Sequence, residues 1–380
     1  MTPTQRAEAF CRRFGLERPI LLAPMAGASP PALSVAVANA GGMGGLGAVL
    51  MQPDEILDWA REVRASGPAA FQINLWIPAA PPARDPAREA EVRAFLAQWG
   101  PEPPLSAGDA APPDFAAQCE ALLDAQPVAA SSIMGLFPAD YARRAKARGM
   151  AWFATVSTVA EARQAEAAGA DVIIAQGMEA GGHRGAFDSA HAERDLVGLF
   201  SLLPAVVDAV SAPVVAAGGV ADGRGVAAAL MLGASAVQIG TGFLRCPEAA
   251  IHPAWADAIG RALPEQTQLS RVFSGRAGRS LATAYVRAAT APGAPKPAPY
   301  SGPAGPHGRD AGRRRPARRH RPDAGLGRPV RGPGLDRIRV RTDQAPVGGR
   351  ATAAGMTAAS RGVDGRSATT SAGCPCFPVG

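Results

Sequence analysis

The sequence is short of cysteine and has no long apolar run. Its 380 residues contain five cysteines, Cys11, Cys119, Cys246, Cys374 and Cys376, which fit no zinc-site spacing and are too scattered for a disulfide framework. No uninterrupted apolar stretch reaches the roughly 18 residues that a membrane helix needs. The N-terminus lacks the basic, apolar, small-residue order of a signal peptide. We therefore expect a cytoplasmic protein with no metal and no membrane partner.

The end of the chain lacks lysine and glutamate. Residues 301–380 hold 15 of the 39 basic and 5 of the 32 acidic residues, a net charge of +10, which leaves 24 basic and 27 acidic residues, a net charge of −3, in residues 1–300. Arg, Gly and Pro without helical periodicity are typical of disorder or of a nucleic-acid-binding arm. Phe377 is the tail's one aromatic residue, so base stacking does not support nucleic-acid binding. We expect a low-complexity, disordered basic tail and no nucleic-acid partner.

Eight short apolar runs alternate with patterns typical of amphipathic helices. Strands that are apolar on both faces and separated by helices indicate a parallel sheet covered by helices. Eight such units are the number that closes a barrel, and a barrel needs about 250 residues. We predict an α/β fold, a TIM (β/α)8 barrel over residues 1–300, with strands at 19–25, 44–49, 70–76, 127–133, 151–156, 171–177, 213–219 and 236–241.

The helices of the predicted barrel have their own start and stop signals. Before the strand at 171–177, Thr158 is an N-cap residue with Glu161 three positions later, which predicts a capping box. Gly169 then stands at the C′ position, and Gly233 ends the helix before the last strand in the same way.

A Pro- and Ala-rich insertion occupies residues 78–115 and is too long for an ordinary β/α loop. We predict one helix in it, over residues 88–98. Insertions after a barrel strand lie at the catalytic face, so the segment is either a lid or a plain surface excursion.

The residues with chemical potential follow the predicted strands at their carboxyl ends, where barrels carry their active sites. Gly218, Gly219, Gly240 and Gly242 lie in two successive loops close to helix N-termini. Glycines there let backbone N–H groups approach an anion without a Cβ in the way. These loops therefore predict a phosphorylated cofactor or substrate.

One histidine stands between glycines in the stretch QGMEAGGHRGAF, residues 176–187. Gly181 and Gly182 bring the backbone close to whatever occupies the barrel mouth. His183 has a reference pKa of about 6.5 and can act as a base, an acid or a hydrogen-bond donor. His191 and His252 have no such setting, and we expect structural roles for them.

Five ordered motifs together resemble a known family. PILLAPMAG, FQINLW, AQGMEAGGHRG, VVAAGGVADGRGVAAALMLGASAVQIGTGFL and SRVFSGRAGRSLATAY, spread over residues 18–300, resemble nitronate monooxygenase, formerly 2-nitropropane dioxygenase, in its class I form. The resemblance implies a TIM barrel with FMN at its mouth and no metal. It also implies oxidation of alkyl nitronates such as propionate 3-nitronate by dioxygen, without a nicotinamide cofactor, to carbonyl compounds and nitrite or a related nitrogen oxide.

The resemblance also implies roles for particular residues. His183 matches the catalytic histidine of the family, and Asn74 and Gln176 would hydrogen-bond the flavin. The remaining matched positions would line the flavin, its ribityl chain and its phosphate: Ala23, Pro24, Met25, Gly181, Gly182, Gly218, Gly219, Gln238, Ile239, Gly240 and Thr241.

The chain departs from the family pattern at two places. Ile133 stands where the family often has a second histidine, and residues 78–115 contain no tyrosine, although the family often places a substrate-contacting tyrosine there. The departures leave the particular nitronate open, and the sequence does not give the oligomeric state.

Two other functions stay open. The first is an NAD(P)H-dependent reductase on the same barrel, similar to the FMN-dependent enoyl-acyl-carrier-protein reductases or to quinone reductases. The enoyl reductases usually have glutamate where Gln176 stands here, which favours the monooxygenase. The second is an inactive flavin-binding barrel whose basic tail binds nucleic acid through phosphate charge.

A shift of the reading frame would also explain the unusual composition of the tail. Back-translation from Ser301 with permitted codons, shifted by one base, allows two stretches that resemble the family's C-terminal segments in the correct order. We therefore hypothesise a single-base frameshift near the codons of Tyr300 and Ser301. With residues 301–380 in their present frame, the barrel would lack helices or substrate contacts at its C-terminal end.

Overall fold

The computed structural model describes residues 1–67, 69–80, 83–109 and 112–297. The basic tail from residue 301 and its hypothesised frameshift lie outside the described residues. In the described part of the chain, no helix is both long enough and apolar enough to cross a membrane.

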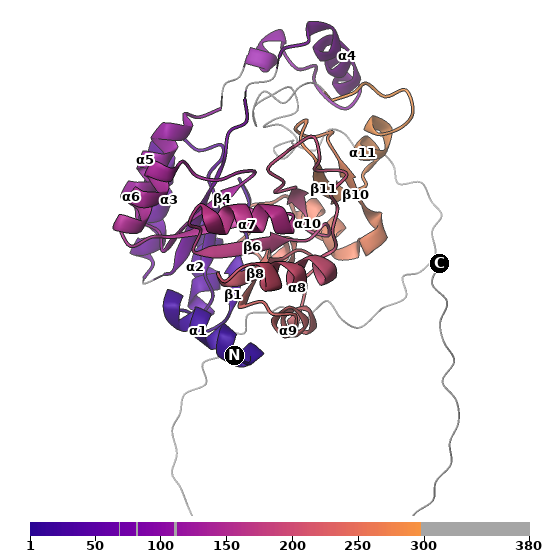
Figure 1. Ribbon diagram of the computed structural model, residues 1–380. Helices are drawn as coiled ribbons and strands as arrows, with labels where there is room; N and C mark the ends of the chain where they lie inside the picture. Colours follow the sequence, from indigo (N-terminus) through magenta and orange to yellow (C-terminus); the bar gives the residue numbers. More distant parts are fainter. Residues whose placement is uncertain (68, 81–82, 110–111, 298–380) are drawn as a thin grey trace, which may run out of the picture. The chain divides into compact units, whose positions relative to one another are not determined.

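Eight parallel strands form the barrel, and the predicted fold class is confirmed (Figure 1). Each predicted apolar run contains one strand. The strands are β1 (Ile20–Leu22), β2 (Gly44–Gly47), β3 (Phe71–Trp76), β4 (Ala129–Ile133), β5 (Ala151–Val156), β6 (Val172–Gln176), β8 (Val214–Ala217) and β9 (Ala236–Ile239).

The sheet order is β1-β9-β8-β6-β5-β4-β3-β2, so its two outer strands are the first two in the chain. Met43, the residue before β2, joins them: its carbonyl accepts a hydrogen bond from Leu22 N at 2.8 Å, and its N–H donates to Ile20 O at 3.0 Å. These two hydrogen bonds turn an open sheet into a barrel.

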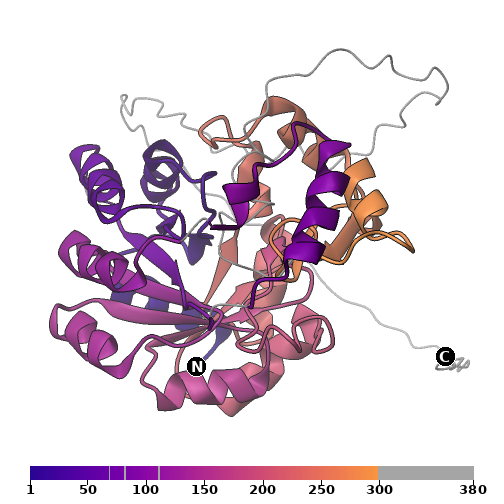
Figure 2. The same ribbon diagram turned by 90° about the horizontal axis from the view of Figure 1, so that it is seen from above.

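Helices surround the strands, as the view in Figure 2 shows. Proline begins several of them, where its missing N–H costs no hydrogen bond. The helices are α1 (Pro3–Phe14), α2 (Pro31–Asn39), α3 (Pro53–Ala65), α5 (Phe115–Ala125), α6 (Ala139–Ala147), α7 (Val159–Ala167), α8 (Leu199–Ala209), α9 (Gly223–Met231), α10 (Pro253–Arg261) and α11 (Ala284–Ala289), with short 3-10 turns η2 (Thr241–Arg245) and η3 (Pro264–Gln266).

The predicted start of α7 is only half right. Thr158 is the N-cap residue, and its Oγ1 accepts a hydrogen bond from Glu161 N at 3.2 Å. The carboxylate of Glu161 accepts hydrogen bonds from Ser157 N at 2.6 Å and from Phe187 N at 2.7 Å. It therefore joins a local and a distant backbone group, which the capping signal did not predict. Gly169 and Gly233 do follow their helices with positive φ, as predicted.

Helix α1 closes the amino-terminal end of the barrel. Phe10 and Phe14 pack with Phe153 of β5, and the Phe14 and Phe153 rings meet edge to face at 5.2 Å. The three side chains are almost fully buried among apolar residues of the strands. The barrel interior is therefore filled at this end, and only the carboxyl end of the strands is left for chemistry.

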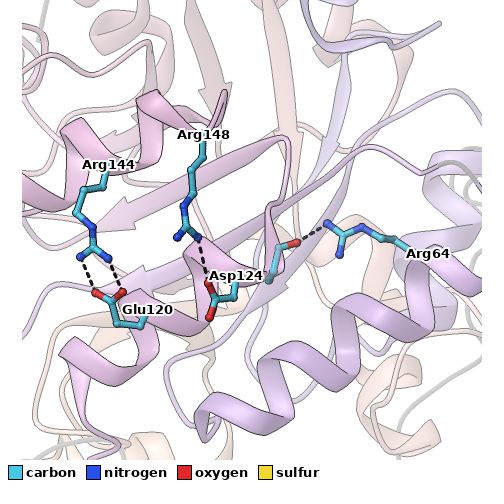
Figure 3. Close-up of polar contacts among 6 residues, drawn as sticks. Arg64, Glu120, Asp124, Arg144 and Arg148 are labelled. Carbon is cyan, nitrogen blue, oxygen red and sulfur yellow. Dashed lines mark hydrogen bonds and ion pairs between the residues drawn. The ribbon is translucent and has the colours of Figure 1, made fainter.

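Surface ion pairs join neighbouring outer helices (Figure 3). Arg144 of α6 contacts Glu120 of α5 with an N–O distance of 2.6 Å, and Arg148, the C-cap residue of α6, contacts Asp124 of α5 at 3.0 Å. Arg64 of α3 donates to Gln126 O at 2.9 Å. Pairs as exposed as these contribute little stability, so the barrel depends mainly on its apolar layers.

The insertion contains α4 (Pro86–Ala97) and the 3-10 turn η1 (Leu105–Asp109), and the helix predicted at 88–98 is confirmed. Phe95 and Trp99 contact Tyr285 of α11, with ring centroids 6.2 Å and 5.5 Å apart. Tyr285 also contacts Phe273 at 5.6 Å. Aromatic contacts thus join the insertion to the last described helix; the choice between a lid and a surface excursion stays open.

A second, small sheet was not expected from the sequence. It has three antiparallel strands in the order β10 (Thr267–Ser270), β11 (Gly278–Leu281) and β7 (Gly182–His183). Its β7 is only two residues long and gives no periodic signal. The sheet nevertheless sets the position of His183.

Candidate active site

His183 lies between two segments that are far from it in the sequence. In β7 it is paired with Gly278 of β11. Its Nε2 lies 2.6 Å from Ser274 Oγ, and its ring meets the edge of Trp76 at a centroid distance of 4.6 Å. Trp76 ends β3, so the imidazole is held at the carboxyl end of the barrel strands.

The surroundings of His183 keep the imidazole neutral. Burial lowers the pKa of His183 to about 4, and the positive charge of Arg276 adds to this effect. Arg276 is itself buried, and its Nη1 lies 2.9 Å from Met134 Sδ, just after β4. At neutral pH, His183 is therefore a hydrogen-bonding group without charge beside a fixed cation.

Gln176 fixes the backbone around His183. Its Nε2 donates to His183 O at 3.0 Å, and its Oε1 accepts from Gly185 N at 2.7 Å. Gly185 packs so closely that a Cβ there would lie 3.4 Å from Ile133 Cγ1 and 3.1 Å from Thr155 Cγ2. The side-chain nitrogen and oxygen of Gln176 thus both hydrogen-bond the backbone of the loop that carries His183.

Three amide side chains, those of Gln72, Asn74 and Gln238, lie in the barrel interior. Gln72 Nε2 donates to Gln238 Oε1 at 2.9 Å and to Leu22 O at 3.1 Å. Asn74 Nδ2 donates to Ser131 Oγ at 3.1 Å. In β3, Gln72 and Asn74 therefore point into the barrel, whereas Phe71, Ile73 and Leu75 point toward the surrounding helices.

The loops after four strands come together beside His183. A Cβ on Gly181 would lie 2.6 Å from Thr241 Oγ1, and a Cβ on Gly218 would lie 2.9 Å from Ala180 N. A Cβ on Gly240 would lie 3.3 Å from Ala23 Cβ and 3.5 Å from Met25 Sδ. These contacts bring together six of the predicted cofactor residues or their direct neighbours: Ala23, Met25, Gly181, Gly218, Gly240 and Thr241. Pro24, Gly182, Gly219, Gln238 and Ile239 adjoin them in the chain.

These loops fit an anionic group. Gly218 and Gly219 have φ values of 107° and 68°, which non-glycine residues rarely adopt. Among the described residues, the N–H groups of Gly218, Gly219 and Gly240 donate to no protein acceptor. Because backbone N–H groups in glycine loops of this kind favour a phosphate, the residues present fit the phosphate of a phosphorylated cofactor.

Three residues of the site were missed as individual predictions: Trp76, Ser274 and Arg276. Ser274 and Arg276 lie in the motif SRVFSGRAGRSLATAY, which carried the resemblance but suggested no particular chemistry. They reach His183 only through the pairing of β11 with β7, a long-range contact without a local signal.

The other two described histidines lie outside this site. His252 caps α10, where its Nδ1 accepts from Ala254 N at 3.2 Å, and His191 is exposed beside Asp188. The structural role expected for His252 is confirmed.

The sequence model of the nitronate monooxygenase family matches residues 9–324 of this chain. The chain belongs to the nitronate monooxygenase family. It is therefore an oxidoreductase. It is 39% identical to a nitronate monooxygenase of Paraburkholderia phytofirmans over 306 residues, which cover 79% of this chain and 83% of the relative. It is also 39% identical to a nitronate monooxygenase of Pseudomonas aeruginosa over 298 residues, which cover 76% of this chain and 83% of the relative.

Solved structures agree with this assignment. A nitroalkane oxidase from Streptomyces ansochromogenes superposes with a TM-score of 0.67 at 35% identity, covering 73% of this chain and 80% of that one. FabK from Thermotoga maritima superposes with a TM-score of 0.58 at 30% identity, covering 73% and 76%. This nitronate monooxygenase family member thus shares its barrel fold with a nitroalkane oxidase and with FabK.

The lowered pKa of half-buried His183 predicts a pH effect on stability. Between about pH 6.5 and pH 4 the unfolded chain protonates this histidine while the folded chain does not, so the unfolded state binds more protons and stability falls as pH falls. When the pH is lowered from about 7 to about 5, the melting temperature of His183→Asn should fall less than that of the wild type. The exposed-site control His191→Asn should lose as much as the wild type; equal losses in all three proteins would contradict a buried, neutral His183.

Proposed function

We propose that this protein uses FMN to oxidise alkyl nitronates, such as propionate 3-nitronate, with dioxygen. The products are carbonyl compounds and nitrite or a related nitrogen oxide. The observation that supports this most is the half-buried, neutral His183 beside four converging loops at the carboxyl end of a nitronate monooxygenase barrel. FMN, when bound, accepts electrons from the nitronate and passes them to dioxygen.

His183 is the proposed catalytic residue, and its environment favours one kind of substrate. A group with a pKa of about 4 is a poor base for the weakly acidic C–H of a neutral nitroalkane. A nitronate has already lost that proton and needs positioning and charge stabilisation instead. The neutral imidazole supplies a hydrogen bond, and the nearby cation of Arg276 favours an anion.

The proposed cofactor contacts follow the geometry of the loops. Gly218, Gly219, Gly240 and Thr241 would hold the phosphate with backbone N–H groups and the Thr241 hydroxyl. Residues 23–25 and Gly181 would lie along the flavin, while Asn74 and Gln176 would reach it from the barrel interior. Gly182, Gln238 and Ile239 complete the proposed lining.

A matched pair of glycines tests the phosphate contact. Gly219 and Gly15 have φ values of 68° and 67°, so alanine at either position costs about 1–2 kcal/mol in backbone strain. Gly15 ends α1 at the other end of the barrel. By fluorescence titration, Gly219→Ala should weaken FMN binding at least about tenfold, whereas Gly15→Ala should not. Equal FMN affinities would remove Gly219 from the site.

The second candidate function is the NAD(P)H-dependent reductase. The likeness to FabK, at 30% identity over most of both chains, is the observation that favours it. The two functions differ in the reductant, because only the reductase needs a nicotinamide cofactor. Oxidation of NAD(P)H by the flavin-loaded protein with an enoyl thioester or a quinone would favour this candidate.

Oxygen uptake without NAD(P)H tests the proposed function. The purified protein loaded with FMN should consume dioxygen rapidly with propionate 3-nitronate and only slowly with the matching neutral nitroalkane. His183→Asn should keep its FMN and lose about a hundredfold or more in turnover, since a positioned hydrogen-bonding group is removed. Full turnover in His183→Asn would exclude His183 from the mechanism, and no uptake by FMN-loaded wild type would contradict the proposed function.

A further inference from the structure

Two buried charges lie next to the segment that leaves His183, and the proposed chemistry uses neither. Glu161 belongs to the first turn of α7 and is 9% exposed, while Arg184 follows His183 directly and is 3% exposed. Burying a charge costs free energy of desolvation, so we expect these two side chains to have a structural or functional role.

Glu161 connects the end of β5 to this segment. Its Oε2 accepts a hydrogen bond from Ser157 N at 2.6 Å, just after β5, and its Oε1 accepts from Phe187 N at 2.7 Å. A capping glutamate normally serves its own helix. Here one of its oxygens holds the backbone four residues beyond the catalytic histidine.

Arg184 connects the same segment to β6 and β11. Its Nη1 donates to Gly177 O at 2.7 Å, directly after β6, and its backbone N–H donates to Ala277 O at 2.9 Å, directly before β11. Within the described part of the chain, its Nε and Nη2 are buried without an acceptor. The guanidinium therefore stays buried although only part of its hydrogen-bonding capacity is used.

The two charges also act on each other through space. Burial raises the pKa of Glu161, and the positive charge of Arg184 opposes that change. Burial lowers the pKa of Arg184, and Glu161 opposes that change in turn. Removing either charge therefore takes away part of the compensation of the other, the rest coming from backbone N–H groups at Glu161 and from Glu179 at Arg184.

We propose that Glu161 and Arg184 are positioning residues that clamp residues 183–187 between β5, β6 and β11, and thereby hold the His183 ring against Ser274 and Trp76. Gln176 holds His183 O and Gly185 N, Glu161 holds Phe187 N, and Arg184 anchors the residue between the first two to Gly177 O. The carboxylate oxygens of Glu161 and the Nη1 of Arg184 are taken up by backbone groups. The inference deepens the proposed function and rests on it for the kinetic part of its test.

The test compares two glutamates of the same helix. Glu161→Gln keeps the size of the side chain but removes its charge and turns one acceptor into a donor facing a backbone N–H. Glu166→Gln makes the same change at the other end of α7, where Glu166 also accepts from two backbone N–H groups, those of Ser211 and Ala212. In oxygen uptake with propionate 3-nitronate, Glu161→Gln should lose at least about tenfold in kcat per bound FMN. Its KM should change little, and Glu166→Gln should match the wild type.

A double variant separates positioning from charge balance. In Glu161→Gln/Arg184→Met no uncompensated charge remains, so thermal stability should recover relative to Glu161→Gln. The kcat per bound FMN should stay low, because the hydrogen bonds to Phe187 N and Gly177 O are still altered or lost. Recovery of kcat together with stability would overturn the positioning role.

A spectroscopic readout keeps this test independent of the proposed function. In protein with isotope-labelled histidine, the His183 resonance, assigned with His183→Asn, should titrate near its lowered pKa in wild type and in Glu166→Gln. In Glu161→Gln the pKa should rise toward about 6.5 as the ring loses its burial. If Glu161→Gln does not fold, Arg184→Lys makes the same test, because it keeps the charge and loses the reach of the guanidinium. An unchanged His183 titration with unchanged kcat would overturn the inference, whereas inactivity of the wild type would fault only the proposed function.

Discussion

The pairing of β7 with β11 is the contact on which the candidate active site depends. Gly182 and His183, in the loop that follows β6, pair with residues 279 and 278. That pairing brings Ser274 to 2.6 Å from the imidazole and places Arg276 near enough to affect it. The barrel supplies a mouth lined by glycine loops, but the small sheet decides which side chains surround the histidine there. Without it, Gln176 would still hold the His183 backbone, but the imidazole would lose its contact with Ser274.

Burial then decides what the histidine can do. Because the ring is held among Trp76, Ser274 and the segment fixed by Gln176, it is neutral over the physiological range. A neutral imidazole beside a cation suits an anionic substrate that has already lost its proton. The site is thus better built for a nitronate than for the corresponding nitroalkane, and the clamp of Glu161 and Arg184 extends this control to residues outside the barrel mouth.

Local patterns predicted the parts of the structure that local physics determines. All eight barrel strands followed from short apolar runs, and Gly169 and Gly233 end their helices because only a positive φ fits there. The converging glycines followed from their places after consecutive strands. Contacts between distant segments could not be read in this way. Glu161 carried a valid capping signal, yet its carboxylate is used by Phe187, and Ser274 and Arg276 gained their place only through β11.

The most direct measurement is the absorbance of protein-bound FMN after mixing with propionate 3-nitronate in the absence of dioxygen and NAD(P)H. We predict rapid bleaching of the flavin, because the nitronate itself is the reductant, and return of the colour when dioxygen is admitted. A flavin that stays oxidised with the nitronate but is bleached by NAD(P)H would rule out nitronate oxidation and assign the barrel to a reductase.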